Sequence, residues 1–163
     1  AYALWHRGEA LAALGRHESA LAAGTEALAI ATRIGHRGWT ATSWRTIGLA
    51  EQSAGHVQAA LQAFERSLAA AEHLDLFACW AAARAALMYL ELGQTESAAT
   101  LVDRALATGP ALGRQEARWA DAVLAVRRGE DRRGAVIEHA VTEAMRGGAL
   151  IYLPVLQTLR TDH

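Results

Sequence analysis

Residues 44–68, WRTIGLAEQSAGHVQAALQAFERSL, decide the fold because they contain two helix-like runs joined by a glycine turn. Before the turn, residues fall at i, i+3, i+4 and i+7, which is the spacing of one helix face: Trp44, Ile47, Gly48 and Glu51. After the turn the same kind of spacing returns, at Ala60, Phe64, Ser67 and Leu68. The stretch therefore predicts a helical hairpin.

The turn of this hairpin recurs along the chain, and such internal repetition is typical of repeat architectures. The copies are LGRHESAL at 14–21, AGHVQAAL at 54–61, LGQTESAA at 92–99 and a weaker RGEDRRGA at 128–135. The turn glycines Gly15, Gly55 and Gly93 are 40 and 38 residues apart, and Gly129 follows after another 36. We therefore expect several copies of one hairpin.

Period-two alternation is absent from the sequence, and Ala, Leu, Glu, Gln and Arg dominate it, so we expect an all-α fold. The spacing predicts helices at 2–14, 17–34, 40–54, 57–73, 77–92, 95–108, 113–128, 131–146 and 149–160. Pro154 cannot donate to the preceding turn, so it should bend or shorten the last helix.

The glycines in these helices predict two different roles. A glycine inside a helix costs about 1 kcal/mol relative to Ala, so we expect Gly8 and Gly48 to allow a neighbouring helix to approach closely. The turn glycines should instead take a left-handed conformation that ends the first helix. The small residues expected where the second helix crosses the first are Ala20, Ala60 and Ala98.

The hairpin resembles the tetratricopeptide repeat, whose pattern is W-x2-L-G-x2-Y followed by A-x3-F. The residues that carry the resemblance are Gly8, Gly15 and Ala20, then Trp44, Gly48, Gly55, Ala60 and Phe64, then Gly93 and Ala98. The match is good over residues 1–108 and loose over 113–146, where Gly134 and Glu138 replace the crossing Ala and the aromatic residue. The resemblance implies a right-handed α-α superhelix of about four hairpins and a terminal helix.

On this basis residues 1–163 form a single domain. Its repeats are expected at about 1–35, 41–74, 79–108 and 113–146, with the terminal helix at 149–160. The link RIGHRGW at 33–39 resembles linkers in large bacterial LuxR-type and antibiotic-pathway ATP-binding regulators. We therefore expect the chain to be part of a larger bacterial multidomain protein that acts in the cytoplasm.

The composition excludes several classes of function. A net charge of −1 and a pI of about 6.7 do not favour nucleic acid or an anionic membrane as partner. All sixteen basic residues are Arg, so a P-loop or Schiff-base enzyme is excluded, and neither HExxH nor CxxC occurs. Cys79 is expected to be a buried apolar residue. The sequence predicts no enzyme activity, no metal and no cofactor.

The resemblance places the first helix of each repeat on the concave face of the superhelix. The groove residues that we expect there are Tyr2, Trp5, His6, Arg45, Leu49, Trp80, Arg84, Leu87, Trp119 and Arg127, with Glu9, Gln52 and Val123 beside them. Aromatic rings interleaved with Arg suit recognition, with the arginines orienting an acidic or carbonyl-bearing group. The alternative is that Trp5, Trp80 and Trp119 only complete packing between adjacent helices.

These expectations lead to a non-catalytic scaffold that binds a protein or peptide in the groove, including other domains of the same parent chain. The alternative is a sensor domain of a transcriptional regulator that binds a small effector. If all three rings are buried, the chain is a structural spacer.

Overall fold

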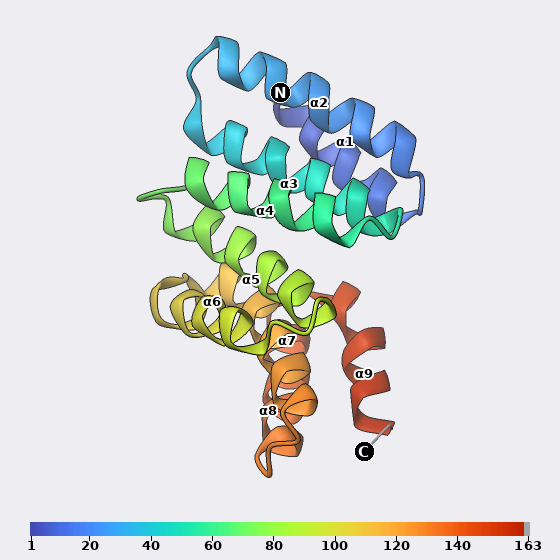
Figure 1. Cartoon of the computed structure of the whole chain (residues 1–163), viewed down its shortest axis with the longest axis vertical. Helices are drawn as coiled ribbons and strands as arrows, with labels where there is room; N and C mark the ends of the chain where they lie inside the picture. The colour runs from blue at the N-terminus through green and yellow to red at the C-terminus, as the bar shows by residue number, and fades with distance from the viewer. Residues whose placement is uncertain (162–163) are drawn as a thin grey trace.

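The computed structural model describes residues 1–161, and every regular element within this range is helical (Figure 1). The elements are α1 (Tyr2–Ala13), α2 (His17–Arg33), α3 (Arg37–Ser53), α4 (Val57–Ala70), α5 (Asp75–Glu91), α6 (Thr95–Thr108), α7 (Ala111–Arg127), α8 (Arg133–Arg146), the 3-10 helix η1 (Leu150–Tyr152) and α9 (Leu153–Thr161).

The helices pair into antiparallel hairpins that stack along the long axis of the molecule (Figure 1). The pairs are α1 with α2, α3 with α4, α5 with α6 and α7 with α8. The first helix of each pair also contacts the first helix of the next, and α3 and α5 share the smallest of these contacts. The predicted all-α solenoid is confirmed.

Each hairpin turns at a glycine whose backbone conformation ends the first helix. Gly15, Gly55 and Gly93 have φ of 70°, 78° and 73°, the left-handed region that their place in the sequence predicts. At Gly55 the next residue, His56, donates its backbone N–H to the Glu51 carbonyl at 2.9 Å. This hydrogen bond satisfies a carbonyl that the end of the helix would otherwise leave unpaired.

Inside α3, Gly48 lies where the aromatic ring of Phe64 from α4 crosses the helix. A Cβ built on Gly48 would stand 2.5 Å from the nearest ring carbon, and the Phe64 side chain is fully buried. The glycine is therefore required by close approach of the two helices, as the sequence predicts.

Small residues allow α5 to be enclosed on nearly every side. It contacts α4, α6 and α7 and, more lightly, α3. Its fully buried alanines are Ala81, Ala82, Ala83, Ala85 and Ala86. Because these side chains end at Cβ, neighbouring helices approach the α5 backbone closely without overpacking.

The C-terminal segment departs from the single helix predicted at 149–160. A 3-10 turn, η1, comes first, and α9 begins at Leu153. Pro154 occupies the first turn of α9, where its missing N–H leaves no helical hydrogen bond unmade. Leu156 then anchors α9 in a core cluster with residues of α7 and α8.

We expect Gly48→Ala to lower the free energy of unfolding by about 1–3 kcal/mol, because the new methyl group overpacks against the Phe64 ring. The matched control is Gly134→Ala in α8, where a Cβ would meet no atom within 4 Å. There the gain in helix propensity should raise stability by up to about 1 kcal/mol. Urea unfolding of both variants measures the contrast, and equal effects would contradict the close approach.

Candidate ligand groove

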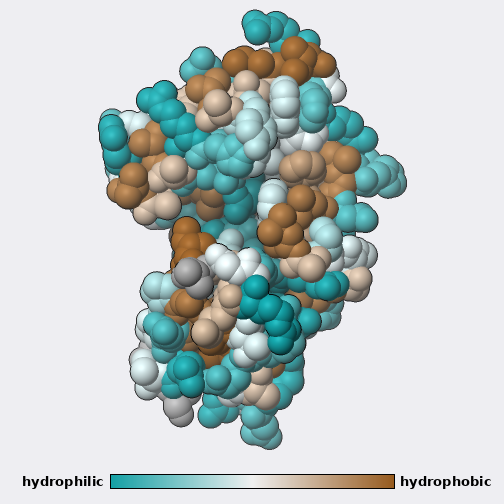
Figure 2. Space-filling view, turned by 180° about the vertical axis from the view of Figure 1, so that it is seen from behind, coloured by the Kyte–Doolittle hydropathy of each residue, from teal (hydrophilic) through white to brown (hydrophobic). Residues whose placement is uncertain are grey.

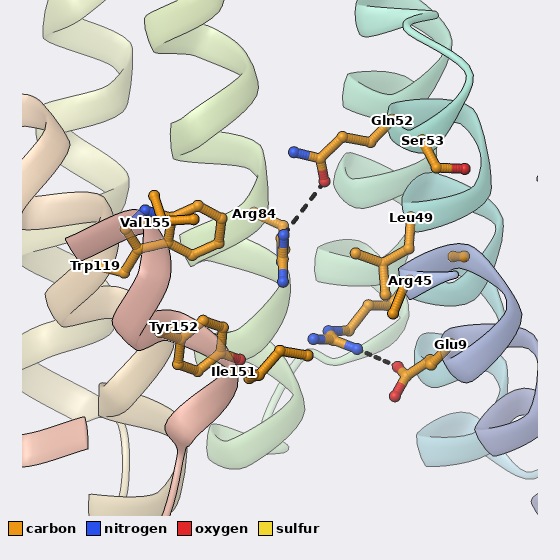
Figure 3. Close-up of a pocket in the computed structure, with 12 residues that line it drawn as sticks. Glu9, Arg45, Leu49, Gln52, Ser53, Arg84, Trp119, Ile151, Tyr152 and Val155 are labelled. Atoms are coloured by element: carbon orange, nitrogen blue, oxygen red, sulfur yellow. Dashed lines mark hydrogen bonds and ion pairs between the residues drawn. The ribbon is translucent and has the colours of Figure 1, made fainter. Parts of the chain in front are cut away.

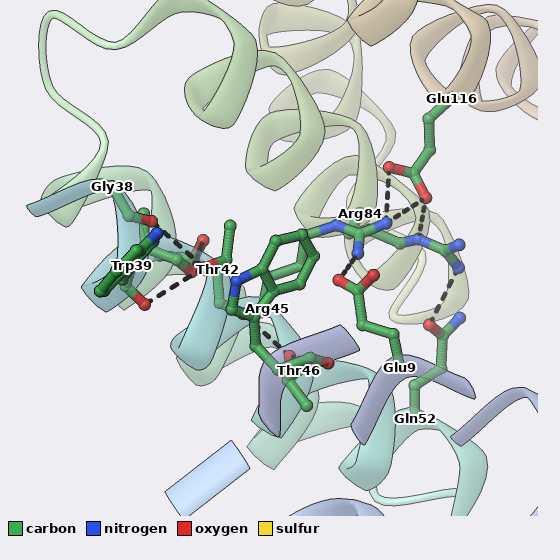
Figure 4. A network of polar contacts seen from close by, with 12 residues as sticks. Glu9, Gly38, Trp39, Thr42, Arg45, Thr46, Gln52, Arg84 and Glu116 are labelled. Atoms are coloured by element: carbon green, nitrogen blue, oxygen red, sulfur yellow. Dashed lines mark hydrogen bonds and ion pairs between the residues drawn. The ribbon is translucent and has the colours of Figure 1, made fainter. Parts of the chain in front are cut away.

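Charged side chains of α1, α3, α5 and α7 meet in one cluster around Glu116 of α7 (Figure 4). The Glu116 side chain is only 1% exposed. Its two oxygens accept hydrogen bonds from Nη2 of Arg45 at 3.0 and 3.1 Å, and Oε1 also accepts one from Nε of Arg84. One carboxylate of the fourth hairpin thus binds arginines of the second and third.

The two arginines extend this network to the rest of the groove (Figure 4). Nη1 of Arg45 donates to the carboxylate of Glu9 in α1. Nη1 of Arg84 donates to the amide oxygen of Gln52 in α3 at 3.3 Å. Polar contacts therefore run from the first hairpin to the fourth. They cross the junction of α3 and α5, which is the smallest contact between the first helices of successive hairpins.

The arrangement keeps the buried groups charged. Burial alone would raise the pKa of Glu116, but the positive charges of Arg45 and Arg84 outweigh it and hold this pKa below its usual value. Burial alone would lower the pKa of Arg45, but Glu116 and Glu9 outweigh it and raise this pKa. Two arginines and two glutamates therefore balance one another within the groove.

Aromatic rings lie against both guanidinium groups. The Cζ atom of Arg45 is 5.5 Å from the ring centre of Trp80, and that of Arg84 is 4.9 Å from the ring of Trp119. Both distances are within the range of cation–π attraction, which extends to about 6 Å. Trp80 and Trp119 are each half-buried, so part of each ring stays accessible.

Tyr152 of η1 reaches into the same cluster from the C-terminal segment. Its hydroxyl donates to Oε1 of Glu116 at 3.2 Å, and its ring stacks on Trp119 with centres 5.5 Å apart and planes at 28°. Burial and, after it, the charge of Glu116 raise the pKa of Tyr152 to about 12. The hydroxyl is therefore a neutral donor at physiological pH.

An open pocket of about 420 Å³ lies beside this cluster (Figure 3). Side chains that line it include Leu49, Gln52, Arg84, Trp119, Ile151 and Val155. A smaller pocket of about 210 Å³, lined by Trp80 and Leu112, shares Glu9, Arg45, Ile151 and Tyr152 with the larger one. Seen from behind, the surface is indented between the two halves of the molecule, with hydrophobic residues at the rim (Figure 2).

The structure brings together only some of the residues predicted for the groove. Those that line the larger pocket are Arg45, Leu49, Arg84 and Trp119, and Trp80 lines the smaller one. Trp5 and Leu87 are instead buried, with 7% and 5% of their surface exposed. Tyr2, His6 and Arg127 are exposed and line neither pocket.

Trp5 lies outside the groove, because its ring packs against neighbouring side chains of α1. Its ring stacks on His6 with centres 3.5 Å apart and meets the edge of Tyr2 at 5.7 Å. Its backbone carbonyl accepts a hydrogen bond from the Thr46 hydroxyl of α3 at 3.3 Å. Of the two roles open to Trp5, packing between adjacent helices is the one that this geometry favours.

Sequence reasoning missed Glu116, Ile151, Tyr152 and Val155. A signal for Glu116 was present, because it lies at i, i+3 and i+7 with Trp119 and Val123 on one face of α7. The other three lie in η1 and at the start of α9, and no periodicity shows where a terminal segment returns to the array.

Within residues 1–161, no three His, Cys, Asp or Glu side chains are arranged to hold a metal ion. No helix in this range combines the length and the apolar character that crossing a membrane requires. Burial, followed by the charge of Glu116, raises the pKa of the Cys79 thiol to about 11, so it stays protonated and is a poor nucleophile.

We expect Glu116→Gln to lower the free energy of unfolding by about 3–5 kcal/mol, because it leaves the buried Arg45 and the partly buried Arg84 without their shared counter-charge. The matched control is Glu96→Gln. Its carboxylate bonds Arg128 at 2.7 Å but is 90% exposed. That change should cost less than about 1 kcal/mol. Urea unfolding at pH 7 measures both, and a cost for Glu116→Gln as small as that of the control would contradict the network.

The same variant predicts a pH dependence. Because the folded pKa of Glu116 is lowered, its contribution is complete above the unfolded pKa of about 4.3 and is lost as the pH falls through the folded value. The stability gap between wild type and Glu116→Gln should therefore be full at neutral pH and close under acid conditions. Urea unfolding at a series of pH values tests this, and a gap that widens in acid would show the opposite sign.

A comparison with known protein families gives a match for the two N-terminal hairpins. Residues 1–73, which contain α1 to α4, match the family model described as tetratricopeptide repeat. A search of curated proteins found no match. The match ends before α5, and the hairpins continue in the same manner beyond it. Residues 1–73 are therefore similar to tetratricopeptide repeats, and the helical hairpins of the rest of the described chain continue the same architecture.

Proposed function

We propose that this chain is a non-catalytic scaffold module that binds a segment of a protein or peptide in its concave groove. The observation that carries the proposal is the pair of neighbouring pockets that share the lining residues Glu9, Arg45, Ile151 and Tyr152. Tetratricopeptide repeats generally mediate contacts between proteins, which supports the same class of ligand.

The chemistry of the groove favours a ligand that is largely apolar. Leu49, Trp80 and Trp119 offer rigid apolar surface, of the kind that is enriched at the energetic centres of interfaces. Arg45 and Arg84 are already paired with carboxylates of the groove itself. A strongly acidic ligand, which the arginines alone suggest, would have to compete with Glu9 and Glu116 for them.

A small effector is the second candidate, because the larger pocket has the volume of a typical small-molecule site, about 300–1,000 Å³. The two candidates differ in how much of the groove they use. A segment of protein should contact both pockets, whereas a small effector should contact one.

The wider setting of the module is part of the same proposal. The linker at 33–39 resembles those of large bacterial regulators, so we place the module in a bacterial regulatory or signalling protein of the cytoplasm. The segment that it binds could then belong to another domain of the same parent protein.

We expect Trp80→Ala to weaken binding of a groove ligand about thirty-fold or more, as for a buried aromatic anchor. Peptides selected from a random library on the whole chain provide the ligands, and calorimetry measures their affinity. The matched control is Trp44→Ala, which removes another half-buried tryptophan under an arginine, Arg66 at 4.7 Å, away from both pockets. It should leave the affinity unchanged.

The exposed Leu112 and the half-buried Leu49 separate the two candidates, because each lines only one pocket. Leu49→Ala and Leu112→Ala should both weaken a peptide. Only one of them should weaken a small effector taken from a metabolite panel. If no selected ligand depends on Trp80, the groove is not the binding site and the scaffold proposal fails.

A further inference from the structure

The segment 150–155, called the strap below, crosses the proposed binding site. It follows two glycines, Gly147 and Gly148, after the end of α8. It places Tyr152 and Ile151 in the lining of the larger pocket (Figure 3), and both side chains line the smaller pocket as well. The groove therefore already holds a peptide segment, supplied by the chain itself.

The strap is packed tightly at its C-terminal end and only loosely on the side that faces the groove. Just after it, Leu156 is 1% exposed and packs with Ile137 and Val141 of α8, so α9 is firmly anchored. On the groove side, Ile151 and Val155 remain 68% and 41% exposed. The strap therefore depends chiefly on Tyr152 for its place in the groove, and α9 can stay docked if that side chain leaves.

The groove is also incompletely satisfied with the strap in place. The indole N–H of Trp119 and the Nε–H of Arg45 are buried and have no acceptor among the described residues. Arg45 as a whole is only 8% exposed and lines both pockets. Buried donors are nearly always paired in folded proteins. The indole N–H of Trp5 is unpaired as well, but Trp5 lines neither pocket, so only Trp119 and Arg45 place such donors where a groove ligand can bring acceptor atoms.

We propose that the groove binds an apolar protein segment with a central tyrosine, and that the strap occupies this place until such a segment displaces it. The inference rests on the proposed function and names its ligand class and its regulation. The strap shows the chemistry that fits: a ring stacked on Trp119, a hydroxyl that donates to Glu116, and aliphatic side chains on both sides.

The ligand need not carry charge, because the glutamates and arginines of the groove neutralise one another. It should expose backbone carbonyls near Trp119 and Arg45, whose donors the strap leaves unpaired. An extended or loosely helical segment meets this condition, since a regular helix uses its own carbonyls internally.

The test uses the whole chain and a fluorescein-labelled peptide with the sequence ALIYLPVL, residues 149–156. Fluorescence anisotropy measures its affinity for wild type and for Tyr152→Ala. Removing the internal competitor should tighten binding at least about tenfold, because a larger fraction of the groove is then free. Replacing the tyrosine of the peptide with alanine should abolish most of this binding.

Tyr89→Phe is the matched control, because the Tyr89 hydroxyl also donates to a glutamate, Glu65 at 2.6 Å, but outside the groove. It should bind the peptide as wild type does. Circular dichroism checks that Tyr152→Ala is folded. If it is not, Tyr152→Phe takes its place, since it removes only the hydrogen bond to Glu116 and keeps the ring that stacks on Trp119.

The inference is overturned if wild type and the strap variant bind the peptide with equal affinity. It is also overturned if replacing the tyrosine of the peptide with alanine leaves the affinity unchanged. The absence of any binding overturns it as well. The proposed function fails separately, when library-selected ligands do not depend on Trp80. If those ligands bind through Trp80 while ALIYLPVL does not, the scaffold stands and only the strap proposal is lost.

Discussion

The buried carboxylate of Glu116 is the group on which the candidate groove depends. It can remain charged away from water only because Arg45 and Arg84 reach it from two other hairpins. The rest of the groove follows from this condition. The guanidinium groups lie against the rings of Trp80 and Trp119, Glu9 and Gln52 accept further hydrogen bonds from them, and Tyr152 gives the carboxylate one more donor.

Glycine and alanine determine how closely the hairpins approach, and so where a groove can form. At Gly48 the absence of a side chain admits the Phe64 ring, which draws α3 and α4 together. Around α5 the alanines allow neighbours on nearly every side. The contact between α3 and α5 is lighter, and residues of both helices line the larger pocket together with residues of α1, α7, η1 and α9.

Much of the fold could be predicted from the sequence, because each hairpin is specified by local signals. The helix face around Trp44 and the turn at Gly55 are sufficient to place one hairpin, and their repetition places the others. The candidate site was only partly predictable. Arg45, Trp80, Arg84 and Trp119 follow from helix faces, but periodicity alone cannot separate Trp5, which is covered by its own hairpin, from rings that stay accessible. Nor can it place Tyr152, whose position depends on how a terminal segment folds back.

The polar network also changes how the array should behave as a mechanical object. In a helical solenoid each repeat contacts only its neighbours, so the superhelix can stretch or unwind from either end like a spring. Here Glu9 of α1 is joined through Arg45 to Glu116 of α7, which links the first hairpin to the fourth. The first and fourth hairpins are then connected directly as well as through the hairpins between them. Stretching the concave face would then require buried ion pairs to separate, so its curvature should be stiff at small forces and yield abruptly rather than gradually.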